Sequence, residues 1–189
     1  MLTLCRNNFI ALMSALLLAG CQSTWFRSAD TRHQLIISVP EQRMHVLEDG
    51  KEIASYLVST AKRGVGDMPD SYMTPRGRMQ VAEKFGDGMP MGTVFKDRKP
   101  TGEIVAADAP GRDPVVTRIF WLRGLEERNR NAYPRFIYIH GTPQESLLGA
   151  PASFGCIRMR STDIVELYER VGTGAQVEVI ETTFVASLP

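Results

Sequence analysis

The sequence predicts a mainly β domain, β-rich and closed or sandwich-like, with a few short helices. Three observations support this prediction. Short runs that alternate in polarity or are rich in β-branched residues recur along most of the chain. Gly- and Pro-rich stretches separate these runs, and the chain holds 16 Gly and 11 Pro. A single segment repeats its apolar residues at helical spacing, and the length of 189 residues corresponds to one domain.

The first strands are expected to form a hairpin. Residues Gln34–Val39 read as a β-branched strand, and Arg43–Leu47 alternates between apolar and polar residues. The turn Glu48-Asp49-Gly50 follows, and Ile53–Ser59 is the next strand-like run. An Asp-Gly pair between two alternating runs is a strong short-range signal of a β-hairpin.

The rest of the chain alternates between loops, strands and one helix. Loops are expected at Lys62–Arg76 and Gly86–Gly102, where Gly and Pro are frequent. A helix is expected at Thr162–Val171, capped by Ser161 and closed by Gly172, because its apolar residues repeat at helical spacing. The remaining predicted strands are Arg78–Phe85, Glu103–Ala107, Val115–Leu122, Arg135–His140 and Gln176–Thr182.

Charge and cysteine content exclude several classes of function. The chain carries 22 basic and 21 acidic side chains, a net charge of +1. A protein that coats nucleic acid needs a basic surface to displace counterions, so no nucleic-acid partner is expected. Three Cys and three His are too few for a disulfide scaffold or a multi-cysteine zinc site.

The N-terminal segment is expected to be an export signal rather than part of the fold. Residues 1–20 contain Arg6 as their one charged residue and an apolar run at Phe9–Ala19, which is short for a bilayer span. The run ends in Leu18-Ala19-Gly20-Cys21, which resembles the bacterial lipobox, so Cys21 is the expected lipidation site. The alternatives are an ordinary secretory signal cleaved nearby and a buried helix.

A lipoprotein of this kind would be exported and held on the periplasmic side, with residues 21–32 as a lipid-anchored tether. The cysteine of a lipobox receives two acyl chains through its thiol, and two chains give stable membrane anchoring. Gln22 after the cysteine favours the outer membrane, if the host is Gram-negative. Signal removal discards Cys5 and lipidation consumes Cys21, which leaves Cys156 as the single free thiol and a candidate reactive group.

Two strand-like runs present a histidine and a cysteine. In Phe136-Ile137-Tyr138-Ile139-His140, period two places Phe136, Tyr138 and His140 on one face and the two isoleucines on the other. In Gly155-Cys156-Ile157-Arg158-Met159, the same period pairs Cys156 with Arg158. We therefore expect His140 and Cys156 on strand faces that line a cleft.

A neighbouring imidazole can take the proton of a thiol, so this pairing predicts an abnormally acidic Cys156. Arg158 would add positive charge or bind a substrate carboxylate. The structural alternatives stay open at this point: a buried cysteine that packs as a small hydrophobe, an arginine in a surface ion pair, and a histidine that caps a loop.

The wider pattern resembles a known family. His140-Gly141-Thr142, ten intervening residues and Ser153-Phe154-Gly155-Cys156-Ile157-Arg158-Met159 look like the signature of the L,D-transpeptidase (YkuD-type) family, a His-Gly followed by [Ser/Thr]-x-Gly-Cys-x-Arg/Asn. The segment Thr74-Pro75-Arg76-Gly77 is also similar to the family pattern. The resemblance covers residues 33–182, the expected catalytic domain, and leaves 183–189 as a C-terminal tail.

The resemblance implies cysteine acyl transfer on peptidoglycan stem peptides within a β-rich catalytic domain. Cys156 would attack the carbonyl of the third stem residue and expel the terminal D-Ala, and His140 would act as base and then as acid. Another amine or water would resolve the thioester. No metal and no organic cofactor is implied, because cysteine acyl transfer requires neither.

The resemblance also implies supporting roles for neighbours of the pair. Backbone N–H groups around the nucleophile would form the oxyanion hole. Gly141 is the candidate for orienting the imidazole, Arg158 for holding substrate or ordering the loop, and Ser153 for supporting the turn. The residues implied in substrate binding or support are Arg158, Gly155, Ser153, Gly141 and Tyr138.

One departure from the family pattern concerns Phe154, since many relatives carry His at this position. The other histidines, His33 and His45, are expected to be structural. Two alternative functions remain: an L,D-carboxypeptidase or hydrolase that uses the same two residues with water as acceptor, and a catalytically inactive lipoprotein that binds peptidoglycan.

Overall fold

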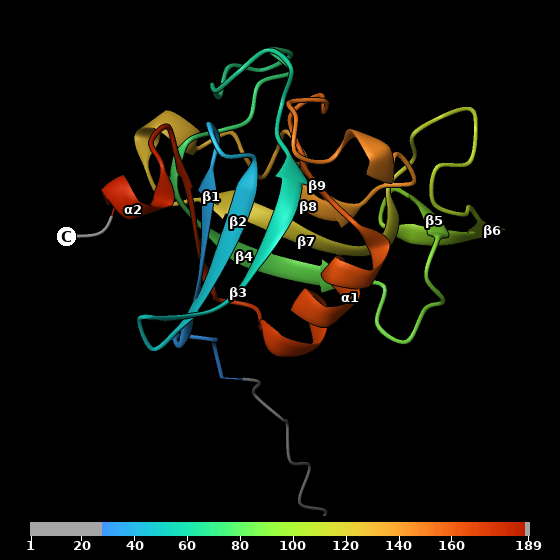
Figure 1. The fold of residues 1–189 in the computed structure, drawn as a ribbon, viewed down its shortest axis with the longest axis horizontal. Coiled ribbons are helices and arrows are strands. Elements are labelled where there is room, and N and C mark those ends of the chain that lie inside the picture. Colours follow the sequence, from blue (N-terminus) through green and yellow to red (C-terminus); the bar gives the residue numbers. More distant parts are fainter. Residues whose placement is uncertain (1–27, 188–189) are drawn as a thin grey trace, which may run out of the picture.

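Residues 28–187 are described in the computed structural model, and they form a closed β-barrel (Figure 1). The helical elements are the α-helices α1 (Ser161–Arg170) and α2 (Phe184–Ser187) and the 3-10 turns η1 (Glu127–Asn129) and η2 (Glu145–Leu147). The strands are β1 (His33–Ser38), β2 (Arg43–Glu48), β3 (Lys51–Ser59), β4 (Gly77–Phe85), β5 (Thr93–Lys96), β6 (Lys99–Ile104), β7 (Val116–Gly124), β8 (Tyr138–Gly141), β9 (Ile157–Met159) and β10 (Gln176–Ile180).

The ring of strands is mixed in direction. Its order is β4-β10-β1-β2-β3-β9-β8-β7, and pairing between β4 and β7 closes it. The pairs β1–β10 and β8–β9 are parallel, and the other neighbours in the ring are antiparallel. The β5–β6 hairpin extends from β7 outside the ring. The predicted mainly β, closed architecture is confirmed.

The predicted first hairpin is also confirmed. Strands β2 and β3 pair antiparallel around Asp49 and Gly50. Both turn residues have positive φ, 50° and 79°, which is the requirement of the two-residue turn that matches the twist of the strands. The helix prediction is confirmed in α1, although the helix begins and ends one residue early, with Arg160 rather than Ser161 as its N-cap and Val171 as its C-cap.

One strand was not predicted, and two predicted strands are wrong in their bounds. Strand β5 lies inside the expected loop Gly86–Gly102, and β6 begins at Lys99 rather than Glu103. Every residue of β6 is exposed, so this edge strand carries no alternation that a sequence pattern could reveal. Strand β8 begins at Tyr138 rather than Arg135, because Phe136 has a φ of 56° and interrupts the extended run.

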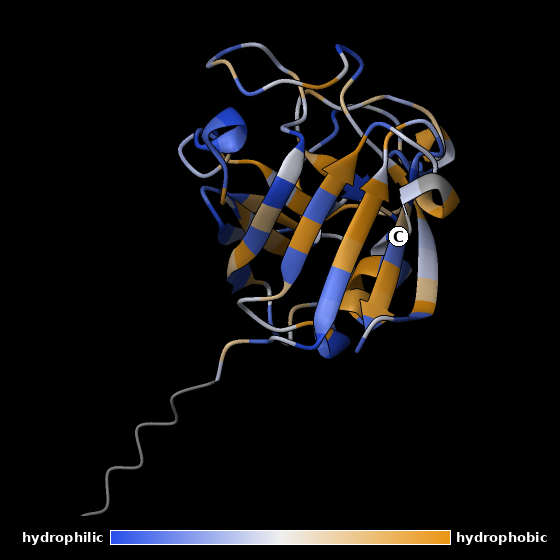
Figure 2. Cartoon of the chain, turned by 90° about the vertical axis from the view of Figure 1, so that its left-hand side faces the viewer, coloured by the Kyte–Doolittle hydropathy of each residue, from blue (hydrophilic) through white to orange (hydrophobic). Residues whose placement is uncertain are grey.

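The barrel encloses one continuous hydrophobic core. Strands banded in alternating hydrophobic and hydrophilic residues make its wall (Figure 2), as period two requires of a sheet with one buried face. Helix α1 closes one end and adds Ile164, Leu167 and Tyr168 to the same core. No helix within residues 28–187 is long and apolar enough to cross a membrane.

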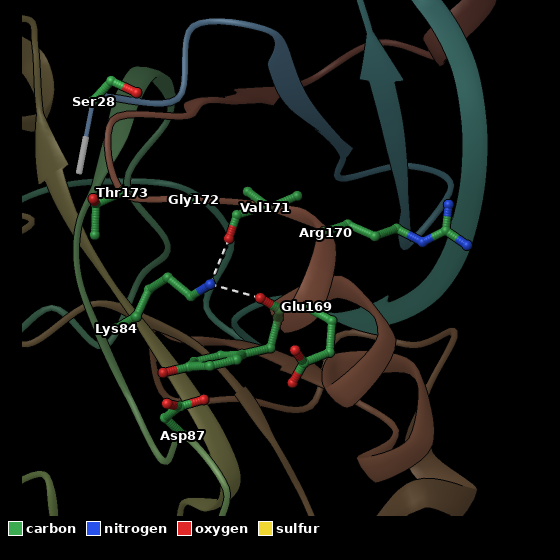
Figure 3. A pocket seen from close by; sticks show the side chains of 9 residues that line it. Ser28, Lys84, Asp87, Glu169, Arg170, Val171, Gly172 and Thr173 are labelled. Carbon is green, nitrogen blue, oxygen red and sulfur yellow. Dashed lines mark hydrogen bonds between the residues drawn. The ribbon is translucent and has the colours of Figure 1, made fainter. Parts of the chain in front are cut away.

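The C-terminal end of α1 is bound by a side chain from the barrel. Lys84 of β4 donates hydrogen bonds of 2.6 Å to the carbonyls of Tyr168 and Val171, and its ammonium lies 3.9 Å from the Tyr168 ring centroid (Figure 3). These residues line a cavity of about 280 Å³. The chain before β1 docks beside them, since Gly172 donates to the Asp30 carboxylate at 2.7 Å.

The predicted signal at residues 1–20, the lipidation site Cys21 and most of the tether at 21–32 lie outside the described residues.

Candidate functional site

The strands β7, β8 and β9 lie side by side, and the predicted site residues occupy neighbouring positions on the outer face of the barrel. His140 is the register partner of Ile119 on β7 and of Arg158 on β9. Two residues before His140, on the same face of β8, Tyr138 pairs with Trp121. Cys156 immediately precedes β9 beside Tyr138, whose backbone N–H donates to the sulfur at 3.4 Å.

Strand pleating separates this face from the core. Ile137, Ile139, Ile157 and Met159 are buried inside the barrel, so alternate residues must point outward. His140 and Cys156 are thereby diagonal neighbours on one face of two adjacent parallel strands. His140 and Cys156, the two residues expected to line a cleft, both line cavities on this face, as do Tyr138 and Arg158.

His140 is buried, and its ring is fixed by its own strand. The ring Nδ1 lies 2.8 Å from the carbonyl oxygen of Gly141. A carbonyl can only accept, so Nδ1 carries the proton and Nε2 keeps its lone pair. Burial lowers the pKa of His140 to about 4, and the nearby Arg158 charge acts in the same direction. The resting imidazole is therefore neutral and can serve as a base.

The Cys156 thiol rests against the backbone of β8. It accepts from Tyr138 N–H and donates to the Phe136 carbonyl at 3.5 Å. No hydrogen bond joins it to His140 within the part of the chain that the structure describes. Burial raises the pKa of Cys156 to about 11. The expectation of an abnormally acidic thiol is therefore wrong for this state, in which thiol and imidazole are both neutral.

Glycine is required directly before the nucleophile. Gly155 has a φ of 128°, a region that side chains rarely occupy, and an added Cβ would lie 3.3 Å from Ile137 and 3.4 Å from the Met73 carbonyl. Ser153 supports the turn, since its hydroxyl donates to the Cys156 carbonyl at 2.5 Å and accepts from Gly155 N–H at 3.1 Å. The Gly155 N–H is thus engaged locally in this state.

Gly141 is required for a different reason. Its backbone lies in β8 against β7, and an added Cβ would lie 2.8 Å from the Val116 carbonyl oxygen. The residue therefore permits close approach of two strands. The same close packing holds the carbonyl that accepts from the imidazole in place.

Arg158 is buried and its charge is matched. Its guanidinium lies 2.5 Å from Oδ2 of Asp113, whose side chain is 12% exposed, and Nη1 lies 3.5 Å from Gln144 Oε1. Thr142 donates to the other carboxylate oxygen of Asp113 at 2.5 Å. Arg158 thus orders the loops that carry Asp113 and Gln144 beside His140.

Asp113 and Gln144 carried no sequence signal, and Thr142 was part of the His140-Gly141-Thr142 motif without an assigned role. Thr142 follows His140-Gly141 directly, and this adjacency is the one signal that could have singled it out. Asp113 lies in an irregular loop before Pro114, where no periodicity predicts a buried carboxylate. Its role depends on contacts between segments that are distant in the sequence.

Two cavities meet at Cys156. One, of about 160 Å³, has His140, Arg158 and Asp113 in its lining. The other, of about 330 Å³, is lined largely by apolar and aromatic side chains, including Tyr72 of the expected loop Lys62–Arg76. Phe154 lines both cavities and is 69% exposed. Cys156 therefore lies in the lining of two cavities.

Fold and site together define a class of protein: a closed, mixed β-barrel that presents a thiol and an imidazole diagonally on adjacent parallel strands. The chain belongs to the L,D-transpeptidase catalytic domain family, because the family model, YkuD, matches residues 32–179.

Curated relatives agree with this assignment. The chain is 27% identical over 154 residues to the Probable L,D-transpeptidase YcfS of Escherichia coli, a match that covers 80% of this chain and 45% of that protein. It is 26% identical over 155 residues to the Probable L,D-transpeptidase ErfK/SrfK of Salmonella typhimurium, covering 79% and 45%. The chain thus spans about half the length of the curated relatives it matches.

Solved structures share the fold. L,D-transpeptidase 3 from Mycobacterium tuberculosis, in complex with a faropenem-derived adduct, matches with a TM-score of 0.52 at 20% identity and covers 79% of this chain and 60% of that one. The C442S mutant of the Enterococcus faecium L,D-transpeptidase matches with a TM-score of 0.50 at 17% identity, covering 79% and 50%.

Proposed function

We propose that this protein is a peptidoglycan L,D-transpeptidase. Cys156 forms a thioester with the carbonyl of the third stem-peptide residue and releases the terminal D-Ala. An amine acceptor then takes the acyl group, which cross-links or remodels the wall. The observation that carries the proposal is the placement of Cys156 and His140 on one outer face, at a point where two cavities meet.

The first half of the reaction begins with a rotation of the Cys156 side chain from the Phe136 carbonyl toward His140. The unprotonated Nε2 takes the thiol proton while the sulfur attacks the carbonyl carbon. The Gly155 N–H leaves the Ser153 hydroxyl and, together with the Cys156 N–H, donates to the developing oxyanion. The tetrahedral intermediate collapses, the C–N bond to D-Ala breaks, and His140 returns the proton to the leaving amine.

The second half reverses the proton traffic. An acceptor amine attacks the thioester carbonyl and loses a proton to His140, and the C–S bond breaks. The departing sulfur takes the proton back and restores the neutral pair. Water in place of the amine gives hydrolysis at the same residues, so the acceptor decides between transfer and carboxypeptidase activity.

The proposed cellular setting is outside the cytoplasm, next to the wall. Cys21 at the end of the lipobox-like segment is the proposed site of the lipid anchor, and residues 21–32 are the tether. The outer membrane is the expected location in a Gram-negative host. Removal of Cys21 is expected to release the chain from the membrane fraction without loss of the folded domain.

Product analysis tests the proposal. The protein is incubated with purified disaccharide-tetrapeptide and the products are identified by mass spectrometry. A dimer joined between two third-position residues is the expected product. Tripeptide with free D-Ala and no dimer would support hydrolysis instead, and no product from a folded protein would support the inactive binding lipoprotein.

Two variants assign the reaction to the site. Cys156→Ala is expected to abolish turnover, and His140→Ala to reduce it by a factor of about 10²–10⁴, the usual contribution of a general base. His45→Ala is the matched control. His45 lies on β2, where it bonds to Glu52 and stacks on Phe184, away from both cavities at the thiol.

A further inference from the structure

A third cavity adjoins the site on the β7 side of Tyr138. It has a volume of about 250 Å³ and is lined mainly by apolar and aromatic side chains, with Asp97 and Arg98 as its two charged residues. Tyr138 and Val115 connect it to the catalytic pair: the Tyr138 backbone bonds the Cys156 sulfur, and Val115 also lines the cavity of His140.

The turn of the β5–β6 hairpin delivers the two charges. Asp97 and Arg98 both have positive φ, 50° and 65°, and connect the two strands tightly. The Arg98 guanidinium carbon lies 4.5 Å from the Trp121 ring centroid and 5.4 Å from that of Phe136. Arg98 Nη1 donates to the Tyr138 hydroxyl at 3.1 Å.

Arg98 forms no close ion pair with a carboxylate within residues 28–187, although the charges of Asp97 and Glu83 act on it from a longer distance. Its guanidinium contacts a phenol and aromatic faces, whereas Arg158 and Arg135 form largely buried ion pairs with aspartates. A guanidinium has five donors in a planar fork that suits carboxylates. An arginine held over rings beside an apolar cavity is therefore available to an anionic group of a ligand.

The distance to the thiol fits a ligand that also reaches Cys156. Trp121, Tyr138 and Cys156 occupy the same level of three adjacent strands. Two strand spacings separate the first from the last, about 10 Å. An aliphatic arm that starts at the reacting carbonyl and ends in charged groups can bridge this span across the apolar lining.

We infer that this cavity binds the side chain of the donor's third residue when that residue is a diamino acid with a distal carboxylate and amine. Arg98 binds the distal carboxylate, Asp97 binds the ammonium on the same carbon, and the apolar lining takes the methylene arm. The inference rests on the proposed function, and it makes Arg98 a specificity residue for diaminopimelate over lysine.

Binding to the full chain with Cys156→Ala tests the inference without turnover. The probes are two tetrapeptides that differ only in carrying diaminopimelate or lysine at the third position. We expect the diaminopimelate peptide to bind about 10- to 100-fold more tightly, the effect of charge-assisted hydrogen bonds. Arg98→Gln is expected to remove this preference and to leave the lysine peptide unaffected.

Matched variants and probes separate the remaining interpretations. Arg112→Gln is the control, because Arg112 is an exposed arginine paired with Glu103. Amidation of the distal carboxylate is expected to reproduce the Arg98→Gln effect, whereas amidation of the terminal D-Ala is not. Asp97→Asn is expected to weaken discrimination between a free and an acetylated distal amine.

Three results would overturn the inference. Equal binding of both peptides to the parent chain would mean that the protein does not recognise the distal carboxylate of the third residue. An equal loss for both peptides in Arg98→Gln would make Arg98 a latch that holds the hairpin. If amidation of the terminal D-Ala, rather than of the distal carboxylate, reproduced the Arg98→Gln effect, the cavity would bind the peptide's C-terminal carboxylate instead. Discriminating binding by a protein that then shows no turnover would contradict the proposed function alone.

Discussion

The buried ion pair of Arg158 and Asp113 is the residue contact on which the order of the site most depends. Arg158 follows the nucleophile by two residues and is the register partner of His140, and Asp113 belongs to a loop without regular structure. Thr142 bonds the same carboxylate. One carboxylate therefore connects three segments around the imidazole.

Asp113→Asn is expected to destabilise the protein by about 3 kcal/mol, because it leaves the buried Arg158 charge without a counter-charge. Chemical denaturation measures this change. The neighbouring exposed Arg112→Gln is the control, with an expected change below about 1 kcal/mol. Equal stability of Asp113→Asn and the parent chain would show that the pair does not hold the loop.

Sequence reasoning recovers the parts of the site that local periodicity determines. Period two in the run that ends at His140 places Ile137 and Ile139 in the core and His140 outside, as the structure has it. The state of the thiol cannot be obtained this way. The pKa of Cys156 depends on burial by segments far along the chain, whereas the pairing of thiol and imidazole predicted a lowered pKa.

At the scale of elements, α1 is held to the barrel by Lys84. The last carbonyls of a helix have no partner within it, and a cation there also complements the helix dipole. Lys84 supplies both hydrogen bonds from β4 and lies over the Tyr168 ring. The helix end and the strand are therefore coupled through one side chain.

Lys84→Met keeps an aliphatic side chain of similar length and removes the ammonium. The expected loss of unfolding free energy is about 1–3 kcal/mol, the range for hydrogen bonds to a charged group. Lys99→Met on the exposed strand β6 is the control, with no measurable loss expected. Thermal unfolding of the two variants compares them, and similar midpoints would contradict the assigned role.

The elements also show where sequence patterns lose information. The hairpin at Asp49-Gly50 and helix α1 were predictable because a turn pair and a helical period are local features. The β5–β6 hairpin was missed because its outer strand is exposed throughout and contains Pro100, a residue tolerated at a sheet edge. This hairpin delivers Arg98, so the third cavity was beyond sequence reasoning as well.

For the molecule as a whole, the neutral catalytic pair makes stability depend on pH. The unfolded chain protonates His140 near pH 6.5, whereas the folded protein does so only near pH 4. Between these values the unfolded state binds more protons, so stability is lost as the pH falls. Cys156 acts at the other extreme, since its folded pKa of about 11 exceeds the ordinary 9.0 and stability is lost as pH rises through that interval.

Denaturation of the parent chain and of His140→Gln between pH 4 and 6.5 tests the acid limb. The parent is expected to lose stability with a slope of up to about 1.4 kcal/mol per pH unit from this one group. The variant lacks the titrating ring and is expected to have a shallower slope. Parallel curves for the two proteins would mean that the imidazole is not held neutral by burial.

Trapping of the acyl-enzyme tests the central claim most directly. The protein is mixed with disaccharide-tetrapeptide donor without added acceptor and quenched in acid. Its mass is then measured by intact-protein mass spectrometry. The predicted result is a single adduct of the donor without its terminal D-Ala, mapped by peptide analysis to Cys156 and missing from Cys156→Ala. A folded protein that releases D-Ala with no adduct at Cys156, or with an adduct elsewhere, would contradict the account.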